Sequence, residues 1–188
     1  DPMIAKLCTW APDRAGAIRG MRQALDEFEV EGIGHNLPFL SAVMDHPIFM
    51  DGTMTTAFIE EQYPDGFVGV DLPEAALRRI AASAAAMNWV GEIRRTRVSG
   101  RMDNHERRVG TDWVIALQGQ SFAVSIDADH DGSTVKFADG SQMRVASQWT
   151  PGDQLATLDV DGTPLVLKVG KISGGFRIRS RGADLKVH

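Results

Sequence analysis

Residues 72–98 read LPEAALRRIAASAAAMNWVGEIRRTRV, and this stretch decides the fold. Pro73 suits the first turn of a helix, and Glu74 near the start with Arg94 near the end follows the charge order that a helix dipole favours. Between these ends the stretch is apolar nearly all round, which is typical of a helix buried on most sides. Its unbroken apolar run is too short to span a membrane. We therefore predict a slender helix over residues 73–97 that the rest of the chain must cover.

The second half of the chain supplies that cover, because from Asp112 onward apolar and polar residues alternate. Eight short runs each present one apolar face, and dipeptides such as Asp131-Gly132 and Asp161-Gly162 separate them as hairpin turns do. Eight antiparallel strands can close into a barrel, which removes the exposed sheet edges. An eight-stranded barrel has to be filled. We therefore predict an eight-stranded antiparallel β-barrel around a central α-helix, with a curved open sheet on one helix face as the alternative.

The helix contributes a specific set of side chains to this predicted core. The expected barrel-core residues are Leu77, Ile80, Ala84, Trp89 and Ile93.

The first 67 residues read as short helices with one extended piece. Met3–Trp10 is mostly apolar and is predicted to be a buried strand, with Cys8 an inert core residue. These elements are too sparse for an independent core, so we expect them to belong to a larger domain. Turn residues over 63–69 mark the boundary, giving domains 1–67 and 68–188. The chain begins Asp1-Pro2 without an initiator Met, which we interpret as a segment of a longer polypeptide.

A loop without clear periodicity, Ser99–Thr111, joins the helix to the first strand. Long loops inside compact domains are usually either functional or disordered. Apolar residues in a polar, locally basic loop suit a protruding contact, and a flexible connection is the alternative. The expected contact residues are Arg101, Met102, His105, Arg107, Arg108 and Val109.

The sequence contains no self-contained active site. A net charge of −5 gives no global attraction to nucleic acid, and one cysteine excludes an intramolecular disulfide and fits a reducing compartment. Asp127–Gly132 looks like the start of a calcium loop, but position twelve is Ala138, so an acidic hairpin turn is the better interpretation. The five histidines have no metal-ligand spacing. Arg177, Arg179 and Arg181 are predicted to form a solvated strand face. We assign no catalytic, cofactor-binding or metal residue.

Several stretches carry a resemblance to a known family. Asp1–Leu7 (DPMIAKL), Asp13–Ala15 (DRA) and Glu31–Leu40 (EGIGHNLPFL) resemble the C-terminal end of an ATP-grasp biotin carboxylase domain. Tyr63–Phe67 (YPDGF) and the helix-then-meander that follows resemble the alpha subunits of the propionyl-CoA carboxylase family. The resemblance implies an α+β chain in which 68–188 is the BT domain, an eight-stranded barrel around a helix that lies between the biotin carboxylase and biotinyl carrier domains.

That resemblance also implies a function for the parent protein. It would use biotin, ATP, Mg²⁺ and bicarbonate to carboxylate biotin, and pass the carboxyl group to propionyl-CoA on a carboxyltransferase beta subunit. The BT domain would dock the alpha subunit onto the beta subunit, with Ser99–Thr111 as the contacting "hook". This segment itself would bind no cofactor, and its partners would include the rest of the carboxylase domain and the carrier domain. The expected location is the bacterial cytoplasm or the mitochondrial matrix, without a membrane or nucleic-acid partner.

Two rival interpretations stay open at this point. One is the alpha subunit of a sibling enzyme, such as a methylcrotonyl- or geranyl-CoA carboxylase, with the same fold and another acyl-CoA. The other is a free-standing ligand-binding β-barrel, which would need a hollow interior rather than one filled by a helix.

Overall fold

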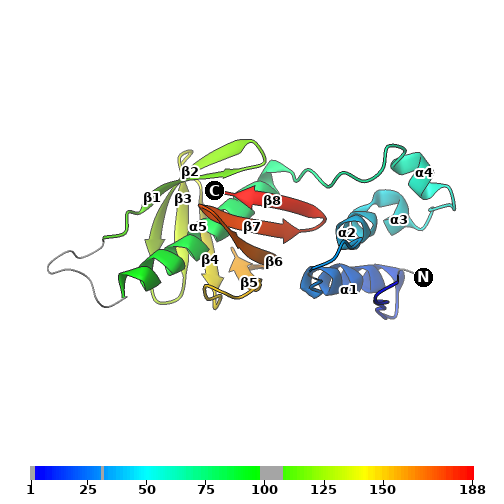
Figure 1. Ribbon diagram of the computed structural model, residues 1–188, viewed down its shortest axis with the longest axis horizontal. Coiled ribbons are helices and arrows are strands. Elements are labelled where there is room, and N and C mark those ends of the chain that lie inside the picture. Colours follow the sequence, from blue (N-terminus) through cyan, green and yellow to red (C-terminus); the bar gives the residue numbers. More distant parts are fainter. Residues whose placement is uncertain (1–2, 31, 98–107) are drawn as a thin grey trace. The chain divides into compact units, whose positions relative to one another are not determined.

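The computed structural model describes residues 3–30, 32–97 and 108–188 (Figure 1). These residues form two compact units. The first comprises residues 1–71 together with the turn at 179–184, and the second comprises 72–178 with 185–188. Among the helices described, none is long and apolar enough to cross a membrane.

The first unit contains four helices among its described residues: α1 (Arg14–Glu27), α2 (Leu37–Asp45), α3 (Pro47–Asp51) and α4 (Phe58–Gln62). Asp13 caps α1, since its Oδ1 accepts a hydrogen bond from the Gly16 N–H at 2.6 Å. α2 ends just before His46, and α3 begins at once with Pro47. Proline is tolerated in a first helical turn, so Pro47 both stops one helix and begins the next.

An aromatic cluster packs within the first unit. The ring of Phe39 on α2 lies 5.3 Å from Tyr63 and 5.6 Å from Phe67, in edge-to-face arrangements. The Phe58 ring of α4 lies 6.1 Å from Tyr63. Tyr63 and Phe67 belong to the turn-rich stretch that was predicted to be a domain boundary. Both pack within the first unit, which extends to residue 71.

The prediction of a buried strand over Met3–Trp10 is wrong for this structure. The segment has no regular secondary structure. Met3 is 59 %, Ile4 64 % and Trp10 86 % exposed, and Cys8 is exposed rather than an inert core residue. A strand needs a neighbouring strand for its backbone hydrogen bonds, and the described residues up to Asp71 form helices and irregular segments but no strand.

The predicted solvated face of arginines is also wrong for two of its members. Within the first unit, Arg179 Nη2 lies 2.7 Å from Glu29 Oε1, and both side chains are half-buried. Arg181 Nε lies 3.0 Å from Asp26 Oδ2, and Asp26 is buried. Alternation within a strand indicates which face a side chain takes, but not whether that face contacts another segment.

The second unit contains α5 (Glu74–Thr96) and the sheet strands, whose order in space is their order in sequence. The strands are β1 (Asp112–Leu117), β2 (Gln120–Ala128), β3 (Ser133–Phe137), β4 (Gln142–Ser147), β5 (Leu155–Val160), β6 (Thr163–Ile172), β7 (Gly175–Ser180) and β8 (Ala183–Val187), with Arg179–Asp184 grouped in the first unit. Pairing is antiparallel from β1 through β6.

Three hairpins turn on two residues that both have positive φ. These are Gln118-Gly119, Asp161-Gly162 and Arg181-Gly182, with φ between 47° and 84°. Positive φ at both central positions is the signature of a type I′ turn, whose twist matches that of paired strands. The turns thus set the register that keeps one apolar face inward.

The sheet nearly closes into a barrel. The Ala116 N–H of β1 donates to the His188 carbonyl at 2.7 Å, and the His188 N–H donates back to the Ala116 carbonyl at 2.9 Å. The first and last strands therefore meet, as the predicted barrel requires.

The concave side of the sheet faces α5, which packs against β1 to β5 (Figure 1). Residues 80–87 of α5 are all buried, so this helix has no solvent face over two turns. Ser83 is fully buried, and its hydroxyl donates to the Arg79 carbonyl at 2.8 Å, which satisfies it inside the helix. The strands contribute these buried side chains: Ile115, Leu117, Phe122, Val124, Ile126, Val135, Phe137, Val145, Ala156, Leu158, Val160, Leu167, Val169, Ile178, Ala183, Leu185 and Val187.

The N-terminal end of α5 is fastened to the β3–β4 turn. The Arg78 guanidinium lies over the Phe137 ring, 4.2 Å from its centroid, and pairs with Asp139 at 2.9 Å. It also donates to the Ser141 hydroxyl. Arg79 donates to the Thr163 carbonyl at 3.1 Å. Two adjacent arginines therefore hold this end of the helix to the sheet.

We expect Ala85→Leu to lower the free energy of unfolding by about 1–3 kcal/mol, because it overpacks a fully buried position. Urea denaturation of the chain followed by tryptophan fluorescence measures the change. Ala75→Leu, at an exposed position of the same helix, is the matched control and should shift stability by less than about 0.5 kcal/mol. Equal effects of the two substitutions would show that α5 is not enclosed.

Candidate functional site

An open cleft of about 1240 Å³ lies beside the C-terminal half of α5, within the second unit. We call it the α5 cleft. One wall is α5 from Ala86 onward together with Arg97 just after it, and the other comprises the β2–β3 turn, the end of β4 with the loop after it, part of β5 and Pro164 of β6. The lining residues include Met87, Trp89, Val90, Ile93, Arg94, Arg97, Asp129, His130, Asp131, Trp149, Pro151, Leu158 and Asp159.

Tryptophans stand on both walls of the cleft. The Trp89 ring lies 6.0 Å from that of Trp113 on β1, and Trp89 is half-buried. Trp149 is only 9 % exposed and packs edge-to-face on Phe176, with ring centroids 5.9 Å apart. Its indole N–H donates to the Asp153 carbonyl at 2.9 Å, so its polar atom is satisfied while its ring stays in an apolar setting.

The loop that carries Trp149 is internally braced. Asp153 accepts hydrogen bonds from both the backbone N–H and the hydroxyl of Thr150, each at 2.9 Å. These bonds favour the ionised carboxylate and lower the pKa of Asp153 below its ordinary value. A loop held in this way presents Trp149 and Pro151 to the cleft without depending on a bound ligand.

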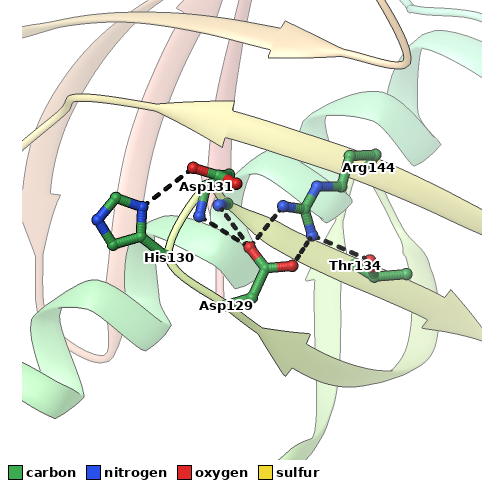
Figure 2. Close-up of polar contacts among 6 residues, drawn as sticks. Asp129, His130, Asp131, Thr134 and Arg144 are labelled. Atoms are coloured by element: carbon green, nitrogen blue, oxygen red, sulfur yellow. Dashed lines mark hydrogen bonds and ion pairs between the residues drawn. The ribbon is translucent and has the colours of Figure 1, made fainter.

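The β2–β3 turn is organised around Asp129 (Figure 2). Arg144 donates from Nη1 to Asp129 Oδ2 at 2.8 Å and from Nη2 to Oδ1 at 2.6 Å, a two-pronged ion pair. Asp129 Oδ1 also accepts the backbone N–H groups of Asp131 and Gly132. The hydrogen bond from Arg144, followed by that from the Asp131 backbone, lowers the pKa of Asp129 to about 2.

The carboxylate at the centre of this turn is used within the turn. The charge of Asp129 is already paired, and the structure shows no group of three or more His, Cys, Asp or Glu suited to a metal ion among the residues it describes. Gly132 has φ 154°, and a Cβ there would lie 2.5 Å from the Val145 carbonyl oxygen. The turn therefore packs too tightly on β4 for another residue, as expected for a hairpin.

The sequence-predicted residues of the helix fall into two groups. Leu77, Ile80 and Ala84 are buried inside the barrel, at 0 %, 2 % and 2 % exposure. Trp89 and Ile93 are half-buried and line the α5 cleft.

Only part of the predicted contact loop can be placed. Arg108 is exposed and Val109 half-buried, immediately before β1. Arg101, Met102, His105 and Arg107 lie outside the described residues.

Sequence reasoning missed the cleft and the role of Trp149. The stretch Pro151-Gly152-Asp153 indicated only a turn. A tryptophan directly before such a turn was the available signal, because a large aromatic side chain at a strand end needs an apolar surface to cover it.

We expect the Asp129 carboxyl to titrate with a midpoint near pH 2 in an NMR titration of the side-chain carbon. Since this pKa lies below the ordinary 3.8, ionised Asp129 stabilises the folded chain above about pH 4, and that contribution is lost as the pH falls toward 2. Arg144→Ala should raise the midpoint. The Asp153 titration, which depends on Thr150, should stay unchanged as the control. An unaltered Asp129 midpoint in Arg144→Ala would contradict the ion pair.

Comparison with known families accounts for both units. A model described as the propionyl-coenzyme A carboxylase BT domain matches residues 80–188, and one described as the biotin carboxylase C-terminal domain matches residues 1–61. The first match covers the barrel and most of α5, and the second covers α1 to α3 and most of α4.

Whole-chain relatives agree with these matches. The chain is 79 % identical over 188 residues to a propionyl-CoA carboxylase alpha chain of Ruegeria pomeroyi, covering all of this chain and 28 % of that protein. It is 31 % identical over 196 residues to the mitochondrial propionyl-CoA carboxylase alpha chain of Rattus norvegicus, covering 26 % of that protein. A methylcrotonoyl-CoA carboxylase subunit alpha of Dictyostelium discoideum is 49 % identical, but over 59 residues, 31 % of this chain and 8 % of that subunit. The chain thus spans little more than a quarter of the propionyl-CoA carboxylase relatives and belongs to the family of propionyl-CoA carboxylase alpha chains.

Proposed function

We propose that this chain is the part of a propionyl-CoA carboxylase alpha subunit that docks the subunit onto its carboxyltransferase beta subunit. The observation that carries the proposal is the agreement of two independent features. The BT-domain match covers residues 80–188, and a barrel filled by α5 occupies the same residues. A filled barrel suits a rigid scaffold that presents surface loops to a partner.

The parent enzyme under this proposal carboxylates biotin at the expense of ATP, with Mg²⁺ and bicarbonate. It then transfers the carboxyl group to propionyl-CoA, giving methylmalonyl-CoA. Biotin, ATP and Mg²⁺ are assigned to other parts of the parent chain. The long propionyl-CoA carboxylase matches, against a methylcrotonoyl match over 31 % of the chain, favour propionyl-CoA as the substrate.

The first unit is proposed to complete the biotin carboxylase domain with polypeptide that this chain does not include. Met3, Ile4 and Trp10 are exposed apolar residues in a stretch without regular secondary structure, and a neighbouring core would cover them. The proposed location is the cytoplasm of a bacterium or the mitochondrial matrix of a eukaryote, as the origins of the relatives suggest.

The alternative interpretation, a free-standing ligand-binding barrel, receives less support. A hollow barrel needs a free lumen, whereas eight consecutive buried residues of α5 lie in this one. The α5 cleft lies beside the helix and opens at the surface, so it does not replace the filled core.

We expect Val109→Asp in the full alpha subunit to weaken its association with the beta subunit by about 2 kcal/mol or more, since a carboxylate would be desolvated at the contact. Binding measured by isothermal titration calorimetry tests this, and Met102→Asp is the companion variant for the same loop. Val68→Asp is the control because Val68 is 97 % exposed and lies before α5. Wild-type affinity for both loop variants would contradict the assignment of Ser99–Thr111 as the contact loop.

We also expect residues 1–188 alone to show no ATP-dependent fixation of bicarbonate. Radiolabelled bicarbonate with ATP, Mg²⁺ and free biotin measures this activity, with the full alpha subunit as the positive control. Fixation by the isolated chain above the level of a boiled sample would refute the assignment of catalysis to other parts of the parent protein.

A further inference from the structure

The α5 cleft carries several side chains of the kinds that protein interfaces favour. Its walls carry Trp89, Trp149, Met87, Arg94 and Arg97, and neither Lys nor Glu is among the described residues that line it. Tryptophan, methionine and arginine are enriched at protein–protein interfaces, whereas lysine, glutamate and aspartate are depleted there, and aspartate is present on the strand wall of this cleft. Val90 is 40 % exposed at the rim, which leaves an apolar side chain open to solvent.

The acidic groups of the cleft already have partners. Asp129 is bound by Arg144 through both carboxylate oxygens. Asp131 Oδ1 lies 3.0 Å from His130 Nδ1. Asp159 Oδ1 accepts the Gly162 N–H at 2.7 Å. Only Asp129 is therefore neutralised by a cation, while Asp131 and Asp159 keep their negative charge on this wall.

The arginines on the opposite wall differ. Arg94 and Arg97 are exposed, and within residues 3–30, 32–97 and 108–188 neither guanidinium has a hydrogen bond or ion pair; the Arg97 backbone N–H donates to the Arg94 carbonyl at 3.1 Å. Arg95, one position along the helix, is paired with Glu92 and does not line the cleft. Charge complementarity thus calls for a carboxylate that approaches Arg94 and Arg97 over an apolar floor.

We propose that the α5 cleft receives an apolar segment of the beta subunit that carries an acidic residue, and that this acid pairs with Arg94 and Arg97. This inference rests on the proposed docking function and adds a second contact to the loop. Arg97 directly precedes the loop stretch Ser99–Thr111, so the cleft and the loop are adjacent along the chain. The volume of about 1240 Å³ exceeds that usual for small-molecule pockets, which favours a polypeptide occupant.

The first test measures binding of full alpha subunits to the beta subunit. The double variant Arg94→Glu/Arg97→Glu should raise the dissociation constant at least about tenfold, and Val90→Asp should act in the same direction. Arg95→Glu is the matched control and should leave the constant within about twofold, because Arg95 does not line the cleft. Circular dichroism and biotin carboxylation by each alpha variant should match wild type, which separates lost docking from lost folding.

The outcomes distinguish this inference from the proposed function. If Val109→Asp weakens binding and the cleft variants do not, docking stands and the cleft inference is overturned. If the cleft variants weaken binding and Val109→Asp does not, the inference stands and the loop assignment falls. Should every variant bind like wild type, both are overturned.

A second test locates the occupant directly. In a Cys8→Ser background, Val90→Cys is labelled with a thiol-reactive photo-crosslinker in the assembled complex, with Ala75→Cys at the other end of α5 as control. The expected product is an alpha–beta adduct from position 90 and not from position 75. An alpha–alpha adduct would identify a second copy as the occupant, and a lack of any adduct at 90 would leave the cleft without a protein occupant; either result overturns the inference.

Discussion

The enclosure of residues 80–87 is the constraint on which the rest of the structure depends. A helix buried on every side cannot carry a polar face, so its residues over these two turns are Ile, Ala, Met and one Ser. Ser83 is tolerated because its hydroxyl bonds to the helix backbone. Small side chains let the surrounding strands approach the helix axis, and the strands in turn supply the large residues that fill the remaining space. Helix and sheet therefore specify each other, and neither is stable in this form alone.

The two ends of α5 have different roles because only one of them is fastened. At the N-terminal end Arg78 contacts Phe137, Asp139 and Ser141, so its charge is used within the barrel. At the other end the guanidinium groups of Arg94 and Arg97 form no ion pair with the residues that the structure describes. The α5 cleft separates this end of the helix from the sheet. Arginine thus fastens one end of α5 to the sheet, whereas at the other end Arg94 and Arg97 face the open cleft.

The sequence predicted the barrel well because its signals are local. A run of alanines, strict two-residue alternation and Asp-Gly turns each depend on a few neighbouring positions, and they agree with one another. The first unit was harder, since Met3–Trp10 has the composition of a buried strand and becomes one only where a neighbouring strand pairs with it. The partners of Arg179 and Arg181 lie about 150 residues earlier in the chain, and periodicity carries no information about contacts so distant. The cleft was not predictable for a similar reason: it exists because a loop and a helix end, separated by some fifty residues, fail to fill the space between them.

The two-residue turns have a consequence for how the barrel assembles. Because every strand is hydrogen-bonded to the next in sequence, most sheet contacts join residues close along the chain. Short loops cost little closure entropy, so the hairpins at Gln118-Gly119 and Asp161-Gly162 are natural early steps in folding. The backbone hydrogen bonds between Ala116 and His188 join the two ends of the meander. They can form only after the strands between them have paired. The seam between β1 and β8 is therefore where the barrel closes last on folding and opens first under stress.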